Sequence, residues 1–296
     1  MSETEVPPVQ HVYDFATLER APRGQTSLKV TEQRSLSAAR SFSAGAVLNG
    51  EHIICMIGSH ARGTGPLAHA EPGEQFNYIL QGTMMSDLEG DRAFAPRGSI
   101  LHMPAGLVRT GLACPDEDVV FLAIRDPRSA GAGPLIHGMH DGPNAFPGFG
   151  SRSDEPRQTL SRILEESEQL PPGPGRRYVY DMHADTDTWR GQSSAEVTSD
   201  RDLRLPPGIR GKLLTGERLH VGVFRLDAQA TLTNYRRDNE QLVFAVEGEI
   251  EARLEDEYVS VGRRCMLHVP AGTRHELHAP EGAIVLIAQD RREARS

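Results

Sequence analysis

The chain has 296 residues, 38% of them hydrophobic and 25% charged, which is enough apolar material for one large domain or two ordinary ones. Lys and Arg number 32 against 41 Asp and Glu, and the net charge of −9 argues against nucleic acid or an anionic membrane surface as a partner, because both select clustered positive charge. No apolar run approaches the roughly 20 residues that cross a bilayer.

The start of the chain, residues 1–8, is acidic and polar and lacks the basic and apolar regions of a secretion signal. The cysteines, Cys55, Cys114 and Cys265, are odd in number and widely spaced, which is typical of reduced, packed thiols. We therefore expect a cytoplasmic protein.

Each half of the chain has the pattern of a β domain. Short apolar or alternating runs bounded by Gly and Pro predict strands, and such runs stand at 52–57, 76–80, 119–124 and 222–226. With 29 Gly and 20 Pro the chain is rich in turn formers, which favours many short strands. Strands of this kind that curl into closed sheets leave no exposed edge. The expected fold class is all-β.

A connector separates the two β regions. Residues 127–150 are rich in Gly and Pro without periodic pattern, whereas the apolar residues of 158–170 fall at helical spacing and predict a short amphipathic helix. Pro and Gly at 171–175 end that helix. The domains we expect are an N-terminal barrel with the active site, a helical connector and a C-terminal barrel, at residues 1–150, 151–175 and 176–296.

The second half of the chain repeats the first. Residues 74–82 begin Glu-Gln and end in Gly, as do residues 240–248. The segment Leu-His-Met-Pro-Ala-Gly at 101–106 returns as Leu-His-Val-Pro-Ala-Gly at 267–272. Both matches have the same offset of 166 residues, so the chain is a duplication.

The first half carries two spaced motifs, Gly63-x5-His69-x-Glu71-x3-Gln75-x6-Gly82 and Gly98-x5-Pro104-x-Gly106-x2-Arg109. They resemble the two motifs of the cupin superfamily, G-x5-H-x-H-x(3,4)-E-x6-G and G-x5-P-x-G-x2-H-x3-N. The matching positions of the second half are Tyr235, Arg237, Gln241, Gly248, Pro270, Gly272 and His275. Because the resemblance covers both halves, it implies a bicupin, with two tandem jelly-roll β-barrels in one chain.

In cupins, two His and a Glu of the first motif and a His of the second hold a divalent metal inside the barrel. Here Glu71 replaces the second His, Gln75 the Glu and Arg109 the last His. Since Arg cannot coordinate a metal, the resemblance leaves His69, Glu71 and Gln75 as the ligand set, for Mn, Mg or Fe. The second half has lost more of the ligand positions, and we expect its barrel to be structural.

His102 is a further candidate. If it faces the interior, it binds substrate there and completes a two-His, one-carboxylate set with His69 and Glu71, the set that suits Fe(II) oxygenases. His268, however, holds the same place in the half that has lost its metal positions. We therefore interpret His102 first as a packing or turn-bonding residue.

The spacing also predicts catalytic roles. Residues i and i+2 of a strand face the same side, so His69 and Glu71 point together into the barrel as an acid/base pair. Arg109 opposite them would hold a substrate carboxylate or enolate, and Asn77 would line the same pocket. This set favours non-oxidative proton transfer next to the carbonyl of an anionic metabolite, in an isomerase, cyclase or lyase.

Two alternatives stand beside this hypothesis. A mononuclear iron dioxygenase would depend on His69 and His102. The other is a non-catalytic ligand-binding bicupin, because both halves depart from the motif. In a separate, purely structural interpretation, Glu71 and Arg109 form only a buried ion pair. In each case the partner is a small molecule, no nucleotide cofactor is expected, and the resemblance implies a homodimer.

Overall fold

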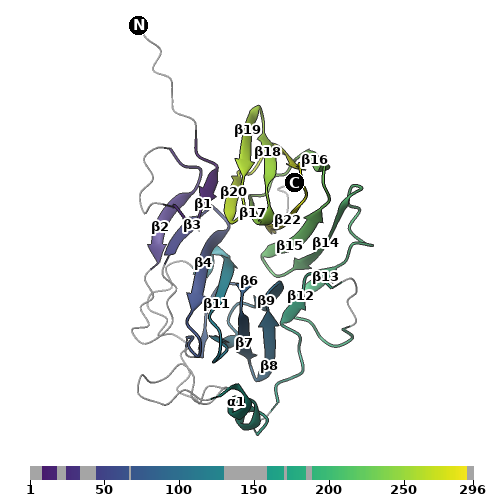
Figure 1. The fold of residues 1–296 in the computed structure, drawn as a ribbon. Helices are drawn as coiled ribbons and strands as arrows, with labels where there is room; N and C mark the ends of the chain where they lie inside the picture. Colours follow the sequence, from purple (N-terminus) through teal and green to yellow (C-terminus); the bar gives the residue numbers. More distant parts are fainter. Residues whose placement is uncertain are drawn as a thin grey trace.

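The computed structural model describes residues 9–18, 25–33, 45–66, 68–129, 159–169, 172–184 and 189–291. Within them the chain forms two seven-stranded and two four-stranded antiparallel sheets, one of each size for each half of the chain (Figure 1). This confirms the all-β prediction. None of the helices in this described part is long and apolar enough to span a bilayer.

The first barrel is built from ten strands of the first half. They are β2 (Lys29–Gln33), β3 (Gly45–Asn49), β4 (Ile54–His60), β5 (His69–Ala70), β6 (Gln75–Gln81), β7 (Thr83–Leu88), β8 (Asp91–Pro96), β9 (Ser99–Met103), β10 (Val108–Ala113) and β11 (Val119–Arg125). A 3₁₀ turn, η1 (Pro127–Ser129), follows, and α1 (Leu160–Ser167) lies within the range where the sequence predicts a helix. Residues 130–158 of the expected connector lie outside the described part.

The second barrel follows the same plan. Its strands are β13 (Glu196–Thr198), β14 (Ile209–Thr215), β15 (Leu219–Leu226), β16 (Ala230–Arg236), β17 (Gln241–Gly248), β18 (Ile250–Leu254), β19 (Glu257–Val261), β20 (Cys265–Val269), β21 (Arg274–Ala279) and β22 (Ala283–Asp290).

Two short strands are exchanged between the halves. β1 (Val12–Asp14), at the start of the first half, pairs with β20 of the second barrel. β12 (Val179–Asp181), at the start of the second half, pairs with β9 of the first barrel. Each large sheet therefore ends on a strand supplied by the other half.

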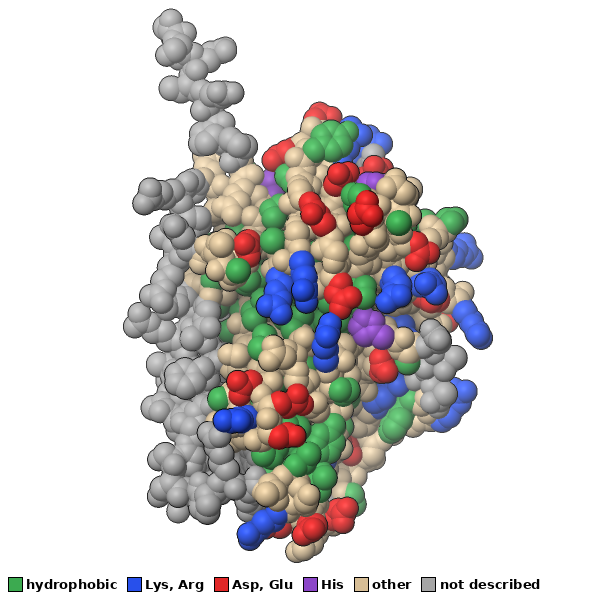
Figure 2. Space-filling model, in the orientation of Figure 1, with side chains coloured by type: hydrophobic (Ala, Val, Ile, Leu, Met, Phe, Trp, Pro, Cys, Tyr) green, Lys and Arg blue, Asp and Glu red, His purple; other side chains and the backbone are tan. Residues whose placement is uncertain are grey.

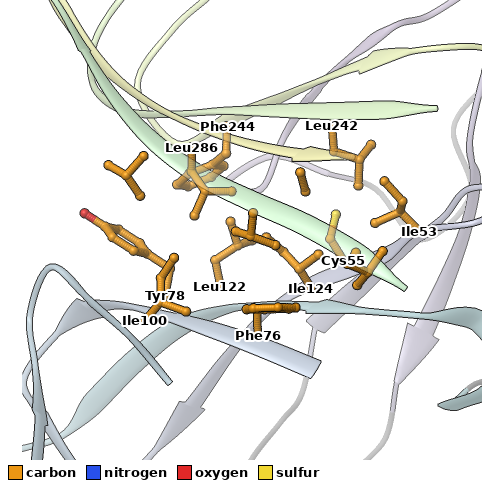
Figure 3. Packing of buried hydrophobic residues seen from close by; sticks show 14 of the residues in the cluster. Ile53, Cys55, Phe76, Tyr78, Ile100, Leu122, Ile124, Leu242, Phe244 and Leu286 are labelled. Atoms are coloured by element: carbon orange, nitrogen blue, oxygen red, sulfur yellow. The ribbon is translucent and has the colours of Figure 1, made fainter. Parts of the chain in front are cut away.

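The large sheets pack against each other through a shared apolar core. Figure 3 shows Phe76, Tyr78 and Ile100 of the first barrel facing Phe244 and Leu286 of the second. The opposite faces of the same strands line the two barrel interiors, where separate apolar clusters lie. Strand alternation thus directs one set of buried large-sheet side chains to the barrel interior and the other to the junction between barrels.

Two buried glutamates fasten this junction. The Glu74 carboxylate accepts backbone N–H bonds of 2.7, 2.9 and 3.1 Å from residues 217–219 of the second barrel. Glu240 accepts the equivalent bonds of 3.0, 2.8 and 3.0 Å from residues 51–53 of the first. The turns that they reach contain Gly50 and Gly216, where a Cβ would collide with the incoming carboxylate.

Candidate acid–base site in the first barrel

The pairing of β5 with β10 brings the motif residues together. His69 stands opposite Arg109 in the register, and Glu71 follows directly after β5. On β10, Ala113 lies an even number of residues from Arg109 and so faces the same side of the strand. Ala113 belongs to the apolar cluster of the barrel interior, whereas Leu112 belongs to a different cluster. Arg109 therefore projects into the barrel, as the spacing predicted for the set.

The Glu71 carboxylate is shared between a guanidinium and an imidazole. Arg109 Nη2 donates to Glu71 Oε2 at 2.6 Å, and His69 Nε2 lies 3.4 Å from Glu71 Oε1. A second bond of 3.2 Å, from Arg109 Nη1 to the Pro104 carbonyl, fixes the guanidinium. The exposed fractions are 1% for Arg109, 7% for Glu71 and 8% for His69, so the set is shielded from water.

The surroundings hold Glu71 in its charged form. Burial alone would raise the pKa of this carboxyl, but the hydrogen bond from His69 and the charges of Arg125 and Arg109 outweigh it. The net effect places the pKa of Glu71 well below its usual range. Glu71 is therefore a carboxylate near neutral pH, held between the Arg109 guanidinium and the His69 imidazole.

Gln75 and Asn77 also enter the barrel interior. Both are buried on β6, and Gln75 Nε2 donates to Asn77 Oδ1 at 2.7 Å. Ile79, the next residue of the same parity, belongs to the interior cluster, whereas Phe76 and Tyr78 belong to the junction core. Asn77 thus lines the interior, as its strand position predicted.

The structure places His102 elsewhere. Its neighbours on β9, Leu101 and Met103, face the interior, so His102 faces the junction, where its ring stacks on Phe76 at 4.3 Å between centroids. Its Nε2 bonds to Glu74 Oε1 at 2.9 Å and its Nδ1 to Ser194 Oγ at 2.8 Å. His102 neither joins His69 and Glu71 nor reaches the barrel interior as a substrate-binding residue, and the two-His, one-carboxylate set is not assembled.

Arg125 is an interior residue that the sequence reasoning missed. Arg125 is the last residue of β11 and pairs with Gln75. It faces the same side of the strand as Phe121 and Ala123, which belong to the interior cluster. Its charge lowers the pKa of Glu71, and its buried Nε has no hydrogen-bond partner among the described residues. The sequence signal that could have found Arg125 is a charged residue at the end of an otherwise apolar strand, at a position that faces the barrel interior.

The residues of this interior do not fit a cupin metal centre. Arg109 stands where the last His of the motif would be, and its cation already binds the Glu71 carboxylate. Gln75 directs its amide nitrogen to Asn77. In the part of the chain that the structure describes, no three His, Cys, Asp or Glu side chains gather as a metal site. The ligand set of His69, Glu71 and Gln75 is therefore replaced by an ion pair with an adjoining imidazole.

No family model and no curated protein matches the sequence. Solved structures do match the fold. A salicylate 1,2-dioxygenase from Pseudaminobacter salicylatoxidans aligns at 14% identity and a TM-score of 0.60, over 95% of this chain and 84% of its own. A mutant of Bacillus subtilis oxalate decarboxylase aligns at 10% identity and a TM-score of 0.59, over 98% and 79%.

A third structure, AerE from Microcystis aeruginosa, aligns at 9% identity and a TM-score of 0.55, over 90% of this chain and 97% of its own. At such identities the likeness concerns the fold. The repeated motifs, the four sheets and these alignments agree, and the chain has the fold of a bicupin, with two cupin jelly-roll barrels in one polypeptide.

Proposed function

We propose that the first barrel is the active site of a metal-independent acid–base enzyme, which moves a proton next to the carbonyl of a small anionic metabolite. The observation that carries the proposal is the Glu71 carboxylate shared between Arg109 and His69 in the buried interior. A carboxylate that is fixed on one side and contacts an imidazole on the other is the usual arrangement for orienting a catalytic histidine.

The three residues take different roles from those of a simple acid/base pair. Because its pKa is held low, Glu71 is a weak base, and it positions His69 and stabilises the imidazolium that forms there. His69 takes the proton from the carbon next to the substrate carbonyl and returns it to the product. Arg109 keeps the carboxylate of Glu71 in place.

Arg125 is the group that remains to bind the substrate. Its buried Nε needs an acceptor, and a substrate carboxylate or the oxygen of an enolate would supply one. Asn77 is buried on the neighbouring strand, two residues beyond Gln75, which pairs with Arg125, and it offers a second amide to a substrate in the interior. Isomerase, cyclase and lyase reactions share this proton-transfer step.

The structural neighbours agree with this substrate class. Two are named for reactions on small carboxylates, oxalate and salicylate. Another structure of the decarboxylase is described by its Mn(II) centres. The ion pair in the present barrel supports a different, metal-free solution on the same fold.

The proposal can be tested before the natural substrate is known. A panel of 2-oxo acids is incubated with the protein in D₂O, and loss of the C3 proton is followed by proton NMR. We expect exchange above the uncatalysed rate for at least one member of the panel. In His69→Gln the exchange rate should fall about 100-fold or more, which is the usual contribution of a general base.

His278→Gln is the matched control, because His278 lies in the second barrel, bonded to Thr231. It should exchange like the wild type. Exchange by no member of the panel, or equal exchange by His69→Gln, contradicts the proposal. Saturable binding of a 2-oxo acid without exchange would favour the non-catalytic binding alternative.

A further inference from the structure

A second candidate site lies outside the barrel interiors, beside the exchanged strand. A cavity of about 590 Å³ opens between β12 and β14, which lie close together in Figure 1. Its volume is in the range of small-molecule pockets. Among the described residues that line it are three cations and two aromatic rings: Arg177, Arg190, Lys212, Tyr180 and Trp189.

Lys212 is the least expected of these residues. Its exposed fraction is 7%, and it lines the cavity from β14. An ammonium group has three N–H donors, yet the one bond that the described residues give it runs to the Asp181 carbonyl at 2.9 Å. Burying a cation with so few acceptors is costly, and an anion in the cavity would supply what is missing.

The aromatic wall is held in place. The Arg177 guanidinium lies over Tyr180, 4.4 Å from the ring centre, and 5.7 Å from that of Trp189. Trp189 Nε1 donates to the Gln192 carbonyl at 3.1 Å, and 43% of the Trp189 residue remains exposed. A flat ring can therefore stack against an oriented indole beside a cation.

One carboxylate, that of Asp181, lies among the described lining residues, and it does not neutralise the wall. Its Oδ1 accepts the backbone N–H bonds of His183 and Ala184, at 2.9 and 3.1 Å. These bonds hold it in a local turn at the end of β12. Among the described lining residues, positive charge is therefore in excess.

The repeat shows that the fold does not require Arg177 or Lys212. At the equivalent positions of the first half, Gln10 stands for Arg177, each in a parallel bridge, and Ala46 on β3 stands for Lys212 on β14. Tyr180, in contrast, has its equivalent in Tyr13. Arg190 likewise has its equivalent in Arg23. The ring and this arginine belong to both halves, whereas Arg177 and Lys212 are features of the second half alone.

We propose that this cavity binds a small aromatic carboxylate, whose charge meets Lys212 and Arg177 and whose ring stacks on Trp189. The site is separate from His69 and Glu71 and does not depend on the reaction proposed for the first barrel.

The chain is suited to a direct test, since Trp189 is its one tryptophan. Intrinsic fluorescence is recorded while the full chain is titrated with benzoate and, in parallel, with the neutral benzamide. We expect a saturable change with benzoate and none with benzamide. His69→Gln should respond like the wild type, which separates this binding from the barrel site.

The variants copy the first half, so that the fold is expected to tolerate them: Lys212→Ala and Arg177→Gln. Each should raise the dissociation constant for benzoate about tenfold or more, because each removes a charge-assisted hydrogen bond. The control is Lys29→Ala, because Lys29 is exposed and is the only other lysine of the chain. No saturable change with benzoate, an equal change with benzamide, or unaltered binding by both variants would overturn the proposal.

Discussion

At the residue scale, Glu71 and Arg109 form a buried ion pair inside the first barrel. The two charges are bonded at 2.6 Å with almost no exposure, so neither tolerates the loss of the other. We predict that Glu71→Gln and Arg109→Gln each lower the free energy of unfolding by about 3–5 kcal/mol, as removing one partner of a buried pair does. Urea denaturation measures this.

The double variant Glu71→Leu/Arg109→Met is the control for that pair. It removes both charges, leaves neither uncompensated, and should recover most of the lost stability. Single variants within about 1 kcal/mol of the wild type would show that the pair is solvated.

His60 gives the first barrel a pH dependence of its own. It packs on Phe121 at 5.1 Å between ring centroids, and burial lowers its pKa from 6.5 to about 4. As pH falls below 6.5, His60 becomes protonated in the unfolded chain but stays neutral in the folded barrel down to about pH 4. The free energy of unfolding therefore declines between pH 6.5 and 4. His60→Leu should flatten this decline by up to about 3 kcal/mol. Parallel stability curves for the two proteins, measured by denaturation at several pH values, would contradict this account.

At the scale of elements, β1 and β12 are tied down by matched tyrosines. Tyr13 Oη accepts the Leu28 N–H at 2.7 Å, and Tyr180 Oη accepts the Ala195 N–H at 2.8 Å. Tyr13→Phe and Tyr180→Phe keep the packing but leave a buried N–H without acceptor, a loss of about 1–3 kcal/mol each.

Amide hydrogen exchange checks this prediction locally. Leu28 should lose protection in the first variant and Ala195 in the second, with the other site unchanged. Equal protection of both amides in wild type and variants would mean that these bonds do not fasten the exchanged strands.

The elements also show how far the sequence alone could go. Strand alternation predicts that His69 and Glu71 face the same side, and the resemblance to the cupin motifs implies that Arg109 joins them. The structure brings the three together. The repeat favours a packing role for His102, in keeping with its stacking on Phe76. The sequence did not place Arg125, since which face of a strand looks inward is decided by pairing with strands far along the chain. The pairing of Val12 with Leu267 also joins strands that lie far apart in the sequence, and no local pattern predicts this strand exchange.

At the scale of the whole molecule, the barrels are one structural unit. They share an apolar core and the reciprocal bonds of Glu74 and Glu240, each of which also binds a histidine, His102 or His268. On the face in Figure 2, both acidic and basic side chains are present, and several basic ones lie close together near its centre.

We therefore predict one cooperative unfolding transition for both barrels. Glu74→Gln and Glu240→Gln, which weaken bonds to a charged acceptor across the junction, should each cost about 2–3 kcal/mol. Calorimetry of the wild type should show a single peak, and two well-separated peaks would contradict a shared core.

The central claim is that the first barrel performs proton transfer without a metal. The most direct measurement is the rate of deuterium incorporation into the responsive 2-oxo acid, after dialysis against a chelator and then with Mn²⁺ or Fe²⁺ added back. The account predicts the same rate in all three conditions, because His69, Glu71 and Arg109 supply the chemistry. A rate abolished by the chelator and restored by either ion would contradict it.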